Sequence, residues 1–219
     1  MLIANAVEKI IGRSPFLDEA LNDELINVSA LARKIRPEVE SMTRKNVRES
    51  AIIMAINRRP ADKRFKVGKS FRLFMNALGD IIVRSGLSDH TFENSPGLGK
   101  CQRRLIDGLS QENEVFYTFS KGVYETTLVA SSSLDGKINE VFGGEKLISY
   151  KSGLSSVTLR LPKDNTEISG VYYYFLKQLA WAGINVCEVI STSNEISLVV
   201  SENDVNHAFP LLMKLKQQS

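Results

Sequence analysis

The sequence predicts an α+β protein in which an all-helical N-terminal segment precedes two copies of a mixed strand–helix unit. Three observations support this prediction. Apolar residues recur at helical spacing through residues 1–59, whereas strands and helices alternate in the remainder of the chain. The alternating pattern occurs twice, since 95–97 matches 168–170 and 124–129 matches 194–199. The offset between the copies drifts only from 73 to 70 residues, so a duplication is the simplest account.

Composition is that of an ordinary folded soluble chain, with 219 residues, 43% hydrophobic and 24% charged. The two cysteines and two histidines show no metal-ligand spacing, so we expect no metal site and no disulfide framework. The start of the chain lacks the features of a secretory signal, and no apolar run approaches the ~20 residues of a membrane span. These features predict a cytoplasmic location and no membrane partner.

Charge is distributed unevenly along the chain. Residues 1–75 hold fifteen Lys/Arg against nine Asp/Glu, and residues 76–219 hold thirteen against sixteen. A basic head on a mildly acidic body is typical of a protein whose head alone meets a polyanion. A small basic excess also occurs on surfaces that bind nothing.

The head, predicted to cover 1–78 with its linker, contains two candidate helices. Asn27 is placed to cap the first, whose apolar residues share one face as far as Ile35. Pro37 is predicted to end or re-start it. Thr43 is predicted to start a second helix that continues to about Arg58. Two short helices joined by a turn resemble a helix-turn-helix of the winged-helix kind.

The basic residues Arg44, Lys45 and Arg48 fall in the predicted first turns of that second helix, so they are our candidate DNA-binding residues. Cations at a helix N-terminus oppose the helix macrodipole, which favours an external anion as their partner. The same geometry also serves for dimerisation or protein packing, so contact with a protein remains the alternative.

The two copies are predicted at 79–151 and 152–219. In the first copy the predicted elements are a strand from 81, a helix at 94–109, strands at 115–120 and 124–130, a helix at 134–142 and a strand at 146–150. In the second copy they are a strand at 156–161, a helix from 166 to 182, strands at 185–191 and 195–200 and a helix at 205–216.

This βαββαβ order is ferredoxin-like, an antiparallel four-stranded sheet with both helices on one face. The second copy lacks its last strand, because the chain has no strand pattern after Lys216. An open sheet edge favours pairing with another strand, either of the other unit or of a second chain. We therefore expect a homodimer with the units side by side.

The segments Gly183–Val186 and 189–197 resemble the ACT domain, and the closest likeness is to the tandem ACT regulatory region of aspartokinases. The likeness is strongest over 155–213 and weaker over 80–150. It implies an amino-acid effector bound at an interface between paired units, in an allosteric regulatory role. No segment resembles the kinase domain of those enzymes.

The resemblance implies a ligand site at the first loop and following helix N-terminus of the second copy. Helix-start N–H groups suit a carboxylate, and an Asp or Asn side chain suits an ammonium group. The candidate ligand-binding residues are Asp164, Asn165, Ile168, Ser169, Gly170, Val171, Asn185 and Val186. In the first copy the corresponding loop is predicted at 89–95, as either a degenerate site or a dimer contact. The tyrosine-rich run 172–175 is assigned to packing between units.

Catalytic motifs are missing from the sequence. The segment 96–101 has glycines and a lysine, but neither the spacing nor the Ser/Thr of a phosphate-binding loop. We predict a non-enzymatic, cofactor-free regulatory protein. The main hypothesis is a regulator whose amino-acid effector controls DNA binding by the head, and the alternative is a free-standing ACT subunit that gives feedback control to a partner enzyme.

Overall fold

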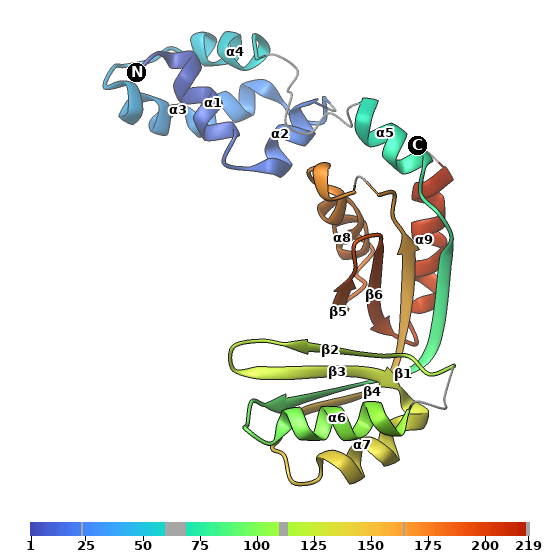
Figure 1. Ribbon diagram of the computed structural model, residues 1–219. Coiled ribbons are helices and arrows are strands. Elements are labelled where there is room, and N and C mark those ends of the chain that lie inside the picture. Colours follow the sequence, from blue (N-terminus) through green and yellow to red (C-terminus); the bar gives the residue numbers. More distant parts are fainter. Residues whose placement is uncertain (23, 60–68, 110–113, 164, 218–219) are drawn as a thin grey trace. The chain divides into compact units, whose positions relative to one another are not determined.

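A computed structural model describes residues 1–22, 24–59, 69–109, 114–163 and 165–217. The chain divides into two compact units, Met1–Lys69 and Ser70–Ser219 (Figure 1). Helices and an antiparallel sheet together make this an α+β protein. Among the described helices, none is both long enough and apolar enough to cross a bilayer.

The N-terminal unit is a bundle of helices. Its described helices are α1 (Ile3–Ile11), α2 (Pro15–Asn22), α3 (Val28–Thr43) and α4 (Glu49–Asn57). Helices α1, α3 and α4 pack against one another around buried residues that include Val7, Ala32 and Ile52. Asn27 caps α3 as the sequence predicts, since its Oδ1 accepts a hydrogen bond from Ala30 N at 3.0 Å. No strand occurs among the described residues of this unit, so they contain no wing.

The predicted end of the helix at Pro37 is wrong, because α3 continues through this residue to Thr43. A proline inside a helix removes one backbone donor and crowds the preceding turn. Ile35 and Val39, on either side of Pro37, are buried in the core of the unit, and this burial offsets the cost. Thr43 ends α3 rather than starting α4, since its Oγ1 donates to Val39 O at 2.8 Å and Arg44 turns to a φ of 55°.

The C-terminal unit is built on one six-stranded antiparallel sheet of order β2-β3-β1-β4-β6-β5. Its strands are β1 (Ile81–Glu93), β2 (Tyr117–Lys121), β3 (Glu125–Ser131), β4 (Leu147–Arg160), β5 (Val186–Ser191) and β6 (Glu195–Ser201). Its helices are α5 (Lys69–Asn76), α6 (Leu98–Gly108), α7 (Asp135–Phe142), α8 (Val171–Trp181) and α9 (Val205–Gln217), with short 3-10 turns η1 (Ser132–Leu134) and η2 (Asn165–Glu167).

The two longest strands, β1 and β4, are shared by both halves of this unit (Figure 1). The second copy has no described strand after α9, and of the two predicted partners for its edge, the other unit or a second chain, the structure shows the first. The start of β1 occupies that position, with Ile81 opposite Leu159 and Arg84 opposite Ser156. From Leu87 onward, β1 pairs instead with β3 and with the start of β4. The predicted boundary at 151/152 falls inside β4, which runs without a break between the halves.

Two glycines mark the place where these strands pass from one half to the other. Gly86 in β1 has φ +69° and Gly153 in β4 has φ +64°, a conformation that strains residues with a Cβ. The register between β1 and β4 shifts at the same place, between Arg84 and Leu87. Glycine therefore lets each strand turn without leaving the sheet.

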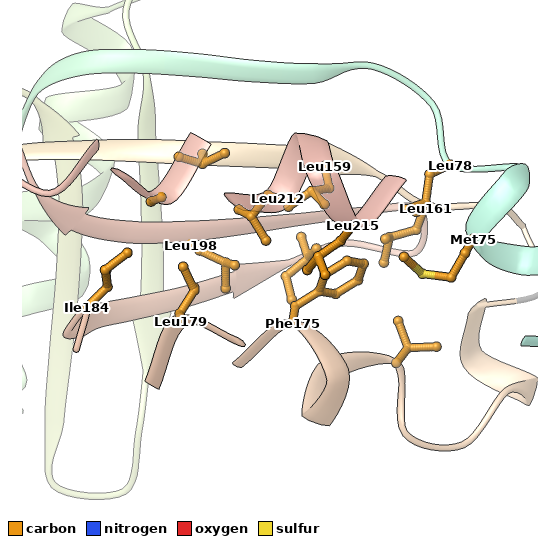
Figure 2. Close-up of a cluster of buried hydrophobic side chains, with 14 of the residues drawn as sticks. Met75, Leu78, Leu159, Leu161, Phe175, Leu179, Ile184, Leu198, Leu212 and Leu215 are labelled. Atoms are coloured by element: carbon orange, nitrogen blue, oxygen red, sulfur yellow. The ribbon is translucent and has the colours of Figure 1, made fainter. Parts of the chain in front are cut away.

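Each half has its own apolar core between its helices and the sheet. Helices α6 and α7 cover the first half through buried residues such as Leu105 and Ile138. The second core lies among α8, α9 and the strands, around Phe175, and α5 contributes Met75 to it (Figure 2). Near the end of α9, Lys216 Nζ donates to the backbone oxygen of Gly79, which follows α5, at 2.7 Å. Helix α5 is therefore an integral part of the second half.

We predict that Met75→Ala lowers the free energy of unfolding by about 2–4 kcal/mol, because it leaves a cavity in this core. Leu73→Ala is the matched control on the same helix, since Leu73 is exposed, and its cost should stay within about 0.5 kcal/mol. Urea unfolding followed by circular dichroism measures both. Equal effects of the two substitutions would show that α5 does not pack as described.

Candidate functional site

A hollow of about 490 Å³ opens at the N-terminus of α8. Four predicted ligand-binding residues line it: Asn165, Ile168, Gly170 and Val171. Thr166, Tyr172 and Tyr173 complete its described lining, although the sequence assigned the two tyrosines to packing between units. Ser169 is exposed beside the hollow and is not part of that lining, and Asp164 lies outside the described residues.

The chemistry of this hollow suits an anion. The first N–H groups of a helix have no partner within the helix, and the macrodipole adds positive potential there. Gly170 occupies the N-cap position with φ +87° and supplies no capping side chain. No side chain in the described lining is charged. The start of α8 therefore presents backbone donors to a space that holds no internal carboxylate among its described residues.

Asn165 fixes the shape of the hollow. It is 5% exposed, and its Nδ2 donates to Pro162 O at 3.0 Å and to Ser193 O at 2.5 Å. These bonds tie the loop after β4 to the turn between β5 and β6. Since the amide nitrogen is already engaged, the role that this geometry gives Asn165 is to hold the loop in place.

The predicted residues Asn185 and Val186 lie elsewhere in the same chain. Val186 is the first residue of β5 and pairs with Val200, whereas the hollow lies beside Ser193, at the other end of β5. The five residue steps of β5 separate the two ends by roughly 16 Å at ~3.3 Å per residue. Within one chain, the structure does not bring these two residues to the hollow.

The loop predicted at 89–95 in the first copy is wrong, because β1 continues to Glu93. His90 is 1% exposed, and its Nε2 lies 3.0 Å from Asp135 Oδ1. Ser88 and Tyr150 also donate to this carboxylate, at 2.5 and 2.7 Å. Burial tends to raise the pKa of Asp135, but these hydrogen bonds outweigh it and lower the pKa. Asp135 is therefore bonded to three neighbouring side chains inside the fold.

A larger hollow, of about 720 Å³, lies at the β2–β3 turn of the first half. Its lining includes the ion pair of Glu93 with Lys146, a second acid, Glu125, and the exposed apolar side chains Val123 and Tyr124. It contains no helix N-terminus, so it lacks the donors that distinguish the hollow at α8.

The predicted DNA-binding residues do not lie on a helix. Arg44 follows α3, Lys45 lies in the turn, and Arg48 immediately precedes α4, so their placement in the first turns of a recognition helix is wrong. All three are exposed, and none forms an ion pair with a described residue.

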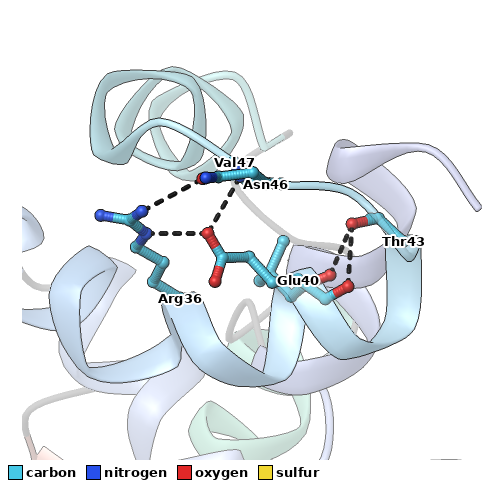
Figure 3. Close-up of polar contacts among 6 residues, drawn as sticks. Arg36, Glu40, Thr43, Asn46 and Val47 are labelled. Carbon is cyan, nitrogen blue, oxygen red and sulfur yellow. Dashed lines mark hydrogen bonds and ion pairs between the residues drawn. The ribbon is translucent and has the colours of Figure 1, made fainter.

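This turn is held by a network around Glu40 (Figure 3). Its carboxylate accepts from Val47 N at 3.0 Å and from Arg36 Nε at 2.9 Å. Arg36 Nη2 also donates to Asn46 Oδ1 at 3.2 Å. The bonds from Val47 and Arg36 lower the pKa of Glu40. Glu40 thus neutralises Arg36 and fixes the backbone that carries the exposed cations.

Comparisons with known proteins identify the fold alone. No family model matches the chain, and no curated protein matches it in sequence. The regulatory subunit of aspartate kinase from Thermus thermophilus is similar in structure, with a TM-score of 0.51 at 12% identity over 64% of this chain and 98% of that chain. Aspartate kinase from Clostridium acetobutylicum gives 0.51 at 14% identity over 63% of this chain and 34% of that chain. The chain therefore contains an ACT-like fold.

Gly170→Ala should lower the free energy of unfolding by about 1–2 kcal/mol, because φ +87° is unfavourable for a residue with a Cβ. Gly99→Ala is the matched control. A Cβ at Gly99 meets no atom within 4 Å, and the residue lies inside α6, so this change should stabilise by about 0.5–1 kcal/mol. Thermal unfolding checks both signs, and a neutral Gly170→Ala would contradict the left-handed cap.

Proposed function

We propose that this chain is an amino-acid-sensing regulatory protein that binds its effector in the hollow at the N-terminus of α8. The observation that supports this most directly is the helix start without a side-chain cap, facing a space with no charged side chain in its described lining. An α-carboxylate suits the N–H groups of a helix start. The similarity of the fold to aspartate kinase regulatory subunits agrees with a regulatory rather than a catalytic role.

A second copy of the chain completes this site in our proposal. The outer edge of β5 has no strand partner among the described residues. Along β5 and α8, Val189, Tyr172 and Trp181 are exposed, and Trp181 is 77% exposed. An unpaired edge beside large apolar side chains favours pairing with another strand. We therefore keep the prediction of a homodimer and place its interface on β5.

Antiparallel pairing of β5 with its copy would account for Asn185 and Val186 in the predicted site. If the two-fold axis passes between Glu188 and Val189, the partner's Val186 lies beside Ser191. That end of β5 is the one that carries the hollow. The partner's Asn185 then supplies an amide to the effector, which a single chain does not do.

A thermal-shift screen of the twenty amino acids tests this function. We expect at least one to raise the unfolding midpoint, since a ligand at 100 times its dissociation constant contributes about 2.7 kcal/mol. Asn185→Ala should raise the dissociation constant of that amino acid about tenfold without changing the fold. Asn206→Ala, an exposed asparagine on α9, is the control and should leave affinity unchanged. A flat response to all twenty compounds would reject amino-acid sensing.

Two functions are candidates for the N-terminal helical head. Control of a partner enzyme by a free-standing regulatory subunit is compatible with the likeness of the fold to regulatory subunits. Binding of nucleic acid is favoured by one observation: Arg44, Lys45 and Arg48 are exposed on a turn held by Glu40, and no described residue forms an ion pair with them. Cations on a turn suit phosphate contacts rather than the reading of base edges by a helix.

A gel-shift titration on duplex DNA separates these candidates. If the turn contacts phosphates, the double variant Arg44→Ala/Arg48→Ala should weaken binding and reduce the slope of log K against log salt by about 2. The control is Arg13→Ala/Arg33→Ala, which removes exposed arginines already paired with Glu38 and Glu49. If wild-type protein gives no shift even at low salt, nucleic-acid binding is rejected and the partner-enzyme candidate is favoured.

A further inference from the structure

A carboxylate of the chain itself lies at the start of α6 in the first half. Ser95 Oγ accepts from Gly97 N and Leu98 N, both at 3.1 Å, and donates to Glu145 Oε2. Cys101, one turn into the helix, lies with its Sγ 3.7 Å from Glu145 Oε1. A Cβ at Gly97 would overlap the same oxygen, so glycine here makes room for the carboxylate. Glu145 therefore occupies the N-terminus of α6.

The starts of α6 and α8 are equivalent places in the two halves. In the first half, Asn94 N donates to Tyr124 O at 2.9 Å, which joins the end of β1 to the β2–β3 turn. In the second half, Leu161 N donates to Asn194 O at 2.7 Å, which joins the end of β4 to the β5–β6 turn. Each of these connections then leads into the helix that follows.

Backbone pairing also identifies the residue that corresponds to Glu145. Glu93 N donates to Lys146 O at 3.0 Å, and at the equivalent place Arg160 N donates to Asp80 O at 3.0 Å. Lys146 thus corresponds to Asp80, and the residues before them correspond as well. The second half has Gly79, which carries no side chain, where the first half has Glu145.

The connecting loops differ in the same sense. Between strand and helix the first half has four residues, 94–97, whereas the second half has ten, 161–170. The short loop holds Ser95 against Glu145. The long loop surrounds the hollow at α8 instead. The second half, which has the hollow at α8, therefore lacks the carboxylate and has the longer loop.

We propose that Glu145 is a built-in carboxylate ligand that permanently fills the first-half counterpart of the effector site. Removing its side chain then creates a second binding site for small carboxylates, at the start of α6. The proposal rests on the function proposed above only in treating the hollow at α8 as an effector site. The role of Glu145 at α6 is argued independently, from its contacts with Ser95 and Cys101.

Chemical rescue by acetate tests the proposal in the full-length protein. Glu145→Ala should lower the unfolding midpoint, because the Ser95 hydroxyl and the Cys101 thiol lose their acceptor and the start of α6 loses a nearby negative charge. Sodium acetate should then raise the midpoint of this variant by about 3 °C more than that of wild type, at ten times its dissociation constant. Sodium chloride of equal ionic strength should not reproduce the difference.

Glu145→Gln is the matched control, because its amide fills the same space and still accepts from Ser95. Acetate should shift its midpoint no more than that of wild type. If Glu145→Ala is unfolded at 25 °C, acetate is expected to restore its helical circular dichroism. A variant that responds to acetate and chloride alike overturns the proposal, whether or not any amino acid binds at α8. Failure of the amino-acid screen, with successful acetate rescue, would reject only the function proposed for α8.

Discussion

The antiparallel pairing of β1 with β4 is the constraint on which the C-terminal unit depends. These two strands run through both halves, and every other strand attaches to one of them directly or through a neighbour. The pairing joins Ile81 to Leu159 at one end and Phe92 to Leu147 at the other, so it closes long loops of chain. Neither half has a complete sheet without it. The halves therefore fold as one unit, although the sequence presents them as consecutive copies.

Local patterns in the sequence predict most of the elements of this unit, because strand and helix periods and glycine stops are properties of short segments. They do not predict which strands pair. Separate strands were predicted at 146–150 and 156–161, whereas in the structure both belong to a continuous β4 that turns at Gly153. The polar residues of 89–91 were likewise predicted as a loop, but inside β1 His90 Nε2 bonds to Asp135 and Thr91 bonds to Thr127.

The candidate site was predictable only where its residues are consecutive in the chain. Loop chemistry and Gly170 identify the start of α8, whereas Tyr172 and Tyr173 were missed because an aromatic run usually packs in a core. Asn185 belongs to the proposed site only through a second chain, which no single-chain pattern encodes. In the head, Thr43 fits a helix start by residue type, but its hydroxyl bonds back to Val39 and ends α3.

The core of the second half connects the hollow at α8 with α5. Met75 and Leu78, at the end of α5, share one apolar core with Leu161 and Val171, which flank the loop around the hollow. A ligand that favours one packing of α8 must also change the packing of this core. The free energy by which it shifts the core between two packings cannot exceed the difference between its binding free energies for them, typically 1–3 kcal/mol. In the sequence, α5 is the first described helix after those of the head, so it is the element of this core that lies nearest to the head along the chain. The core beneath α6 contains no α5 residue among those described. The carboxylate proposed to fill the site at α6 is consistent with this difference, because the core beneath α6 does not connect with α5 in the described part of the chain.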